Sequence, residues 1–260
     1  MSFSFRVLPI FLIIASTAAC SGGGDDNASQ GACSAAKISG GESCSDGQPN
    51  VAYILTSGPS GGFECTGSYI SLTAVLTAAH CFAPDTTEAT IASRGAVRRG
   101  TEFTVHPLYD GSVDSPYDIA VLKVDVPLNN APLPLLISRE PQLGEELVAY
   151  GYGEDQNGLG AVGRIESGES PLKAAFITYI GNDFGSIAIT SAGDGSVCPG
   201  DSGGPVLAKD GSGRYGIIGI TRAGVGICDA DADVPAFLSS TQTSAAIQFL
   251  NEVAPDAAVN

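Results

Sequence analysis

The chain has 260 residues, a formal net charge of −16 and a hydrophobic fraction of 43%. The excess of acidic residues argues against nucleic acid as a ligand, because phosphate binding requires a basic face. It is consistent with a soluble protein that works outside the cell. The length is sufficient for one large all-β domain or for two small barrels with a real core.

Residues 1–20 have the pattern of an export signal. The positive charge of Arg6 precedes an apolar core, Val7 to Ile14, which is followed by small residues. This core is too short to cross a membrane as a mature helix. Residues 17–20, Thr-Ala-Ala-Cys, resemble a bacterial lipobox whose first residue is not aliphatic, which predicts an exported lipoprotein lipidated at Cys20. The alternative is ordinary secretion, with cleavage among the preceding alanines.

Residues 21–37 are predicted to be a flexible tether or propeptide. Their first part, residues 21–30, is rich in glycine and polar residues and is too hydrophilic to contribute to a core. A tether that begins at a cysteine is what an anchored lipoprotein needs.

Cysteines provide a further indication of export. They lie at positions 20, 33, 44, 65, 81, 198 and 228. If Cys20 carries lipid, an even number remains, as expected for disulfides in an oxidising compartment, and six cysteines allow fifteen pairings. No Cys-x-x-Cys pair is present, so a zinc site is discounted.

Short β-rich runs separated by glycine and proline turns follow, a pattern typical of a barrel or a sandwich. The strands expected in the first half are 51–55, 67–72, 74–76, 103–105 and 119–124. Residues 127–134 are proline-rich and predict a link between two halves. The second half begins with 146–153, and its last element is predicted to be a helix capped by Ser239 and Ser240, with Ile247, Leu250 and Val253 on one face.

Ser202 lies between glycines in the sequence Gly-Asp-Ser-Gly-Gly-Pro, residues 200–205. The spacing also fits the nucleophile elbow of α/β hydrolases, where acid and histidine follow the serine. The two histidines of this chain, His80 and His106, both precede Ser202. Chain order therefore excludes the elbow.

A serine hydroxyl needs a base within hydrogen-bond reach and a third group that orients this base. His80 lies in Thr-Ala-Ala-His-Cys, residues 77–81, and Asp118 begins Asp-Ile-Ala-Val-Leu, residues 118–122. These two segments and the one around Ser202, in that order, closely resemble the chymotrypsin/trypsin-like serine endopeptidases. The resemblance implies an all-β fold of two antiparallel β-barrels with a C-terminal α-helix. By contrast, His106 and Asp114 lack a motif and are expected outside the site.

The resemblance also implies a mechanism. Ser202 is the nucleophile, His80 the general base and Asp118 the residue that orients His80. The backbone N–H groups of Gly200 and Ser202 form the oxyanion hole. The substrates are then proteins or peptides, and no metal or cofactor is expected. The alternative is a homologue that has lost catalysis and acts as a binding or regulatory module.

Lys37 and Ile38 begin Lys-Ile-Ser-Gly-Gly, which resembles the activation site of this family. Cleavage there, by another protease, frees the ammonium of Ile38, which pairs with Asp201. The alternative is a glycine turn before the first strand. The protease domain is then 38–260, divided into barrels 38–135 and 136–238 and a helix 239–254.

The same resemblance implies disulfides Cys65–Cys81 and Cys198–Cys228, which leaves Cys33 with Cys44. The latter bond would keep the cleaved leader attached, so that the active enzyme stays tethered.

Specificity also follows from the resemblance. The floor of the primary pocket is Ser196, with Val197 beside it, Gly224 at the mouth and Ala236 on the opposite wall. None of these is a carboxylate, so an uncharged substrate side chain is expected.

Two positions depart from the family pattern. Tyr152 occupies the position of a usual tryptophan. Arg222 and Ala223 replace a usual Ser-Trp pair, which places Arg222 close to Asp118, unless the alignment is shifted by one residue and Thr221 lies there.

Overall fold

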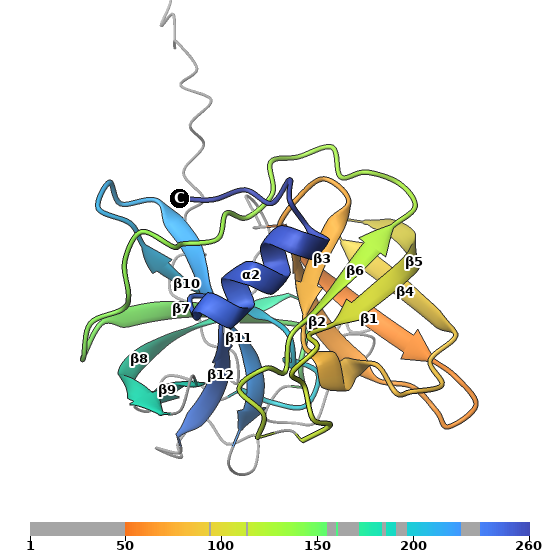
Figure 1. The fold of residues 1–260 in the computed structure, drawn as a ribbon, viewed down its shortest axis with the longest axis horizontal. Coiled ribbons are helices and arrows are strands. Elements are labelled where there is room, and N and C mark those ends of the chain that lie inside the picture. The colour runs from red at the N-terminus through yellow and green to blue at the C-terminus, as the bar shows by residue number, and fades with distance from the viewer. Residues whose placement is uncertain are drawn as a thin grey trace, which may run out of the picture.

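A computed structural model describes residues 50–93, 95–112, 114–154, 160, 172–183, 186–190, 197–224 and 235–260. These residues form two closed antiparallel β-barrels and a C-terminal helix (Figure 1). The predicted fold class is confirmed. Among the described residues, no helix has the length and apolar character needed to cross a membrane.

The first barrel has the strand order β1-β2-β3-β6-β5-β4. Its strands are β1 (Val51–Ser57), β2 (Glu64–Tyr69), β3 (Ala74–Thr77), β4 (Glu88–Ser93), β5 (Ala96–Val105) and β6 (Ala120–Val124). A short 3-10 turn, η1 (Ala79–Cys81), follows β3. The predicted strands all lie in this barrel, but β4 and the first part of β5 were not predicted. Residues of β5 are mostly exposed or half-buried, so the strand lacks a hydrophobic pattern.

The second barrel has the order β10-β11-β12-β9-β8-β7. Its strands are β7 (Glu146–Gly151), β8 (Lys173–Asp183), β9 (Ser186–Thr190), β10 (Pro205–Lys209), β11 (Tyr215–Gly224) and β12 (Ala236–Ser240). If its strands are counted from β7, the second barrel has the same strand order as the first barrel counted from β1. The two halves are thus a structural repeat that is not apparent in the sequence.

Each barrel buries inward-facing aliphatic side chains. Ile54, Leu76 and Leu122 are almost fully buried in the first barrel, as are Leu147 and Leu238 in the second. Burial of each such side chain contributes roughly 1.5–3 kcal/mol relative to exposure. The larger of two core clusters joins the first barrel to second-barrel residues such as Val148 and Ile217, and the smaller lies within the second barrel. The site described below lies where the barrels meet.

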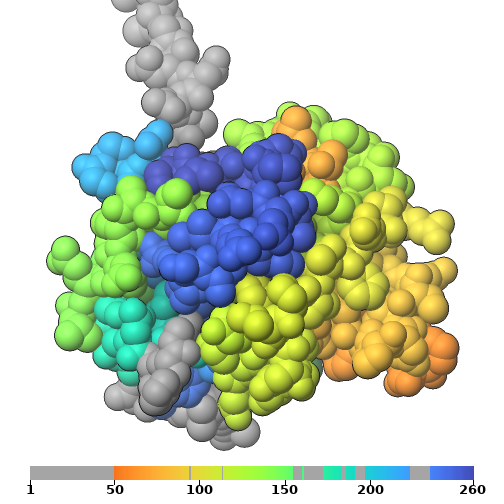
Figure 2. Space-filling model, viewed as in Figure 1, coloured from red at the N-terminus to blue at the C-terminus, as the bar shows by residue number. Residues whose placement is uncertain are grey.

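Helix α2 (Ser244–Val253) lies on the face of the molecule seen in Figure 2. Its buried residues Ala246, Phe249 and Leu250 belong to the core cluster that includes the first barrel. His106 is also buried here. Its Nε2 donates to Ala245 O at 3.3 Å, and burial lowers its pKa.

The predicted start of this helix is wrong. Ser239 and Ser240 belong to β12, where they pair with Ser186 and Gly219, so their backbone groups are already used in the sheet. The N-cap is Thr243, whose side chain accepts a hydrogen bond from Ala246 N–H at 3.1 Å. Sheet pairing, which is non-local, decided the boundary between strand and helix.

Candidate active site

Strand pairing brings His80 and Asp118 together. Thr77, at the end of β3, is opposite Ala120, at the start of β6. The chain that continues from Thr77 into η1 therefore meets the chain that enters β6, which carries Asp118. Two segments separated by 38 residues in the sequence thus meet at one end of the first barrel.

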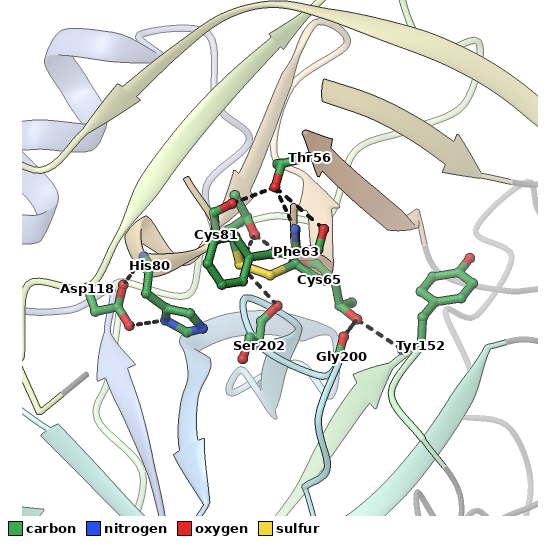
Figure 3. Close-up of a disulfide and its surroundings, with 11 residues drawn as sticks. Thr56, Phe63, Cys65, His80, Cys81, Asp118, Tyr152, Gly200 and Ser202 are labelled. Atoms are coloured by element: carbon green, nitrogen blue, oxygen red, sulfur yellow. Dashed lines mark hydrogen bonds and ion pairs between the residues drawn. A yellow bond between two sulfur atoms is a disulfide. The ribbon is translucent and has the colours of Figure 1, made fainter. Parts of the chain in front are cut away.

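Both oxygens of Asp118 hold His80. The imidazole Nδ1–H donates to Asp118 Oδ2 at 2.6 Å, and the His80 backbone N–H donates to Oδ1 at 2.8 Å. Asp118 is fully buried, whereas 18% of the His80 side chain is exposed. The carboxylate therefore fixes the ring orientation and the tautomer, leaving Nε2 as the acceptor. The ring lies between Asp118 and Ser202 (Figure 3).

Ser202 is supplied by the second barrel and is half-buried. Its neighbour Gly203 has φ +80°, and a Cβ there would lie 2.1 Å from Thr77 Oγ1. The glycine is thus required both by the backbone conformation and by the close approach of the first barrel. Gly203 N–H also donates to Thr221 O at 2.7 Å, which anchors the turn on β11.

Thr66 ties this turn to the first barrel. It is fully buried, its backbone N–H donates to Ser202 O at 2.8 Å, and its hydroxyl donates to Gly200 O at 2.8 Å. The same hydroxyl accepts from Tyr152 N–H at 2.9 Å. Sequence reasoning missed Thr66, because only the tertiary structure shows that Thr66 contacts the loop around Ser202, residues 199–204, which is called the serine loop below.

The peptides that precede Gly200 and Ser202 are oriented through their carbonyl groups. Pro199 O accepts from Glu154 N–H at 2.8 Å, and Asp201 O accepts from Gly204 N–H at 2.9 Å. In a trans peptide the N–H points away from the carbonyl, so Gly200 N–H and Ser202 N–H are directed away from these partners. Within the described part of the chain, neither N–H group donates a hydrogen bond to a protein acceptor.

Comparison with known proteins decides the family. The family model described as Trypsin matches residues 38–247. The chain belongs to the trypsin family. Its fold and family are those of a serine-type endopeptidase.

Its relatives in the trypsin family come from distant organisms. Trypsin zeta of Drosophila erecta is 30% identical over 202 residues, covering 63% of this chain and 68% of the relative. A trypsin-like protease of Streptomyces glaucescens is 27% identical over 204 residues, 70% of this chain and 72% of the relative. Glucanase inhibitor protein 3 of Phytophthora sojae is 27% identical over 237 residues, 83% and 88% of the two chains.

Asp201 is the residue of the serine loop that precedes Ser202, and in this trypsin-family chain it is fully buried. Its Oδ1 accepts from Gly153 N–H and its Oδ2 from Cys198 N–H, both at 2.8 Å. A Cβ on Gly151 would lie 1.9 Å from Asp201 Oδ1, so the carboxylate rests directly on glycine backbone. Asp201 thereby connects the serine loop to the end of β7.

We expect Gly153→Ala to displace Asp201 and to lower kcat/KM by roughly a hundredfold, the effect of impairing one oxyanion donor. A methyl group there would lie 2.5 Å from Asp201 Cγ, a contact that is relieved when the Asp201 side chain moves. Peptidase kinetics on the activated protein would measure the loss. The matched control is Gly211→Ala, whose methyl group meets no atom within 4 Å. If Gly153→Ala and Gly211→Ala were equally active, Asp201 would not be needed to hold the serine loop in place.

A disulfide stabilises the segment around His80. Cys65 and Cys81 are bonded, the pairing implied by the resemblance, and they close a loop across β2 and β3. Cys65, Cys81 and His80 also form a cluster of potential metal ligands, but both sulfur atoms are used in the disulfide, so the set does not suit a metal. Cys198 is also disulfide-bonded. Cys228, Cys33 and Cys44 lie outside the described residues.

Only part of the predicted specificity pocket is described. Val197 packs against the core of the second barrel, and Gly224 of β11 pairs directly with Ala236 of β12. The residues predicted at the mouth and on the opposite wall are therefore direct neighbours on two adjacent strands. Ser196 lies outside the described residues, as do Lys37, Ile38 and Cys20.

A cavity of about 440 Å³ adjoins the serine loop at Pro199 and Gly200. It is lined by Gly62, Phe63, Glu64, Tyr152, Glu154, Gly160, Pro199 and Gly200.

Tyr152 is 6% exposed and packs edge-on against Tyr53 with ring centroids 5.9 Å apart. Burial, together with the Glu64 carboxylate, raises the pKa of Tyr53. Tyr152 thus supplies aromatic packing between the barrels, where the family usually has tryptophan.

Proposed function

We propose that the chain hydrolyses internal peptide bonds through an acyl-enzyme formed on Ser202. The observation that carries the proposal is the pair of hydrogen bonds from His80 to Asp118, at 2.6 and 2.8 Å. With Nδ1–H held by Asp118, His80 Nε2 has its lone pair available to accept the Ser202 proton. The three residues then act as nucleophile, base and orienting acid.

In the proposed reaction, Ser202 Oγ attacks the substrate carbonyl carbon while His80 Nε2 takes the hydroxyl proton. Gly200 N–H and Ser202 N–H stabilise the developing oxyanion, a role supported by the carbonyl bonds that orient both peptides. His80 then gives this proton to the leaving amine. In the second half, water attacks the acyl carbon while His80 takes its proton and passes it to Ser202 Oγ, which leaves as the acid product is released. Buried Asp118 stabilises the imidazolium in both halves.

The proposed primary pocket accepts an uncharged side chain. Ser196 forms its floor, Val197 lies beside it, Gly224 lies at its mouth and Ala236 lies on the opposite wall. The direct pairing of Gly224 with Ala236 supports placing both residues at one site. None of the four residues can pair with a substrate lysine or arginine.

Activation is proposed to occur by cleavage between Lys37 and Ile38, carried out by another protease. The new ammonium of Ile38 would pair with Asp201. The complete burial of Asp201 supports the assignment, since a buried carboxylate without a compensating charge is strongly destabilising. The Asp201 backbone is part of the serine loop, so this pairing would order the oxyanion donors.

The protein is further proposed to be exported, through residues 1–20, from a bacterial cell. Lipidation of Cys20 would leave it anchored at the membrane by residues 21–37, and secretion without lipid is the alternative. Disulfides are typical of an extracytoplasmic setting, which the Cys65–Cys81 bond supports.

A second candidate function is that of a non-catalytic homologue which binds other proteins. Two observations favour it: a relative of similar length is named as a glucanase inhibitor, and Arg222 introduces a charge whose field reaches Asp118. The His80–Asp118 geometry favours catalysis, because a binding module has no need of an oriented imidazole.

A fluorophosphonate probe distinguishes the two functions. The purified protein is treated before and after cutting at Lys37–Ile38, and the labelled residue is identified by mass spectrometry. We expect Ser202 to be labelled only after the cut. Labelling of the uncut chain would overturn the activation step, and absence of labelling in both folded forms would overturn catalysis.

A further inference from the structure

Arg222 is a buried arginine that connects the two barrels. It lies in β11 and is 5% exposed, although arginine is rarely buried without partners. Its Nη1 donates to Asp114 O at 2.8 Å and to Ser186 Oγ at 3.0 Å. Asp114 belongs to the first-barrel loop that leads to Asp118, and Ser186 begins β9 of the second barrel. One guanidinium nitrogen therefore bridges Asp114 and Ser186, which are 72 residues apart in the chain.

The strand is shaped to direct this side chain inward. The register between β11 and β12 shifts between Thr221 and Ala223, so Arg222 is the extra residue of a bulge, a device that redirects a side chain. The guanidinium carbon lies 5.8 Å from the ring centre of Phe237 on β12. A planar cation stacked on an aromatic ring has restricted freedom, so its hydrogen bonds are held in place.

The charge of Arg222 interacts through space with carboxylates of the first barrel. Burial lowers the pKa of Arg222, and Asp118 is the larger of two opposing contributions, with Asp114 the smaller. Arg222, and not Thr221, is thus the residue whose charge acts on Asp118. Thr221 instead exchanges backbone hydrogen bonds with the serine loop, at Gly203 and Gly204.

The loop held by Arg222 is the one that positions Asp118. Asp118 N–H donates to Ser115 O at 3.2 Å, and Ser115 N–H donates to Ser112 O at 3.1 Å. These are consecutive turns that share Ser115, and the carbonyl that accepts from Arg222 belongs to Asp114, within the first of them. Movement of Asp114 is therefore transmitted along a few bonds to Asp118.

We propose that Arg222 is a positioning residue for the reaction: it clamps the Asp114–Asp118 segment to β9 and so holds Asp118 against His80. The proposal rests on the proposed function, but the clamp itself is a structural property that can be measured separately. Loss of the clamp shifts Asp118 without removing it, and a displacement on the order of 1 Å costs about a hundredfold in rate.

The test compares Arg222→Met, Arg222→Lys and Ser186→Ala with the parent protein. Hydrogen exchange of the Asp114–Asp118 peptide reports on the clamp, and fluorophosphonate labelling and peptidase kinetics report on the site. We expect Arg222→Met to exchange faster in this peptide and to lose about ten- to a hundredfold in kcat, with KM little changed. Arg222→Lys, which keeps the charge, should restore part of kcat.

Ser186→Ala removes one hydrogen bond and retains the arginine, so it tests the clamp if Arg222→Met does not fold. It should increase exchange in the same peptide and lower kcat by a few-fold, about the effect of one hydrogen bond. The control is Arg139→Met. Arg139 bonds Glu145 Oε2 at 2.9 Å and Lys209 O at 2.8 Å, so neither exchange at Asp114–Asp118 nor kcat should change.

Unchanged exchange in both clamp variants would overturn the proposal. So would faster exchange with unchanged kcat, since the segment would then move without affecting Asp118. If the activated parent is not labelled at Ser202, the proposed function fails, and the exchange data still decide whether Arg222 holds the segment.

Discussion

Replacement of Ser202 by alanine is expected to lower peptidase kcat by about four to six orders of magnitude. The substitution removes the proposed nucleophile while leaving the loop intact, because Gly203 N–H still bonds Thr221 O and Thr66 N–H still bonds the carbonyl of residue 202. The free energy of unfolding should therefore change little. Kinetics on the activated protein, together with thermal unfolding, would measure both quantities.

The matched control for this variant is Ser212→Ala. Ser212 is exposed in the turn between β10 and β11, where its hydroxyl contacts Asp210. Its loss should leave kcat unchanged. If Ser202→Ala kept more than about one percent of the parent activity, another residue would have to supply the nucleophile.

Asp118→Asn is expected to lower kcat by about ten-thousandfold, a magnitude carried over from triad proteases of this family. The asparagine oxygen can still accept from His80 backbone N–H, but its NH₂ group then faces Nδ1. The ring must take the tautomer in which Nδ1 accepts and Nε2 carries the proton. In that tautomer His80 cannot accept a proton from Ser202.

A carboxylate outside the site provides the comparison. Asp110→Asn changes an exposed residue whose oxygen accepts from Ser112 N–H, a bond that the amide retains. Its kcat should equal that of the parent. If Asp118→Asn also retained full activity, Asp118 would have no part in orienting His80, and the triad would be incorrect.

The chemistry was predicted from short segments around His80, Asp118 and Ser202. Their residue types and their order along the chain exclude the nucleophile elbow and favour a serine protease, without knowledge of any contact. The glycines around Ser202 indicate a tight loop, because such a loop needs residues with positive φ. Gly200 and Gly203 have positive φ in the structure. A tight loop and a short motif both depend on residues that are adjacent in the sequence, so they can be recognised from the sequence alone.

Several parts of the fold could not be predicted. The strand β5 is mostly exposed, and its pairing with β4 and β6 specifies it more than its own hydrophobicity does. The end of β12 depends on β9 and β11, which is why the helix begins later than its serines indicated. At these places, whether a residue belongs to a strand depends on partner strands that are distant in the chain.

The sequence by itself predicted the kind of fold and the residues proposed to react, because three short segments resemble those of a known protease family. Only the tertiary structure decided how those residues are held. Thr66 supports the serine loop from the other barrel, and Arg222 reaches Asp114 O across 108 residues of sequence. The physical reason is that hydrogen bonds and burial join groups that are close in space, and barrel closure, rather than sequence distance, brings them together.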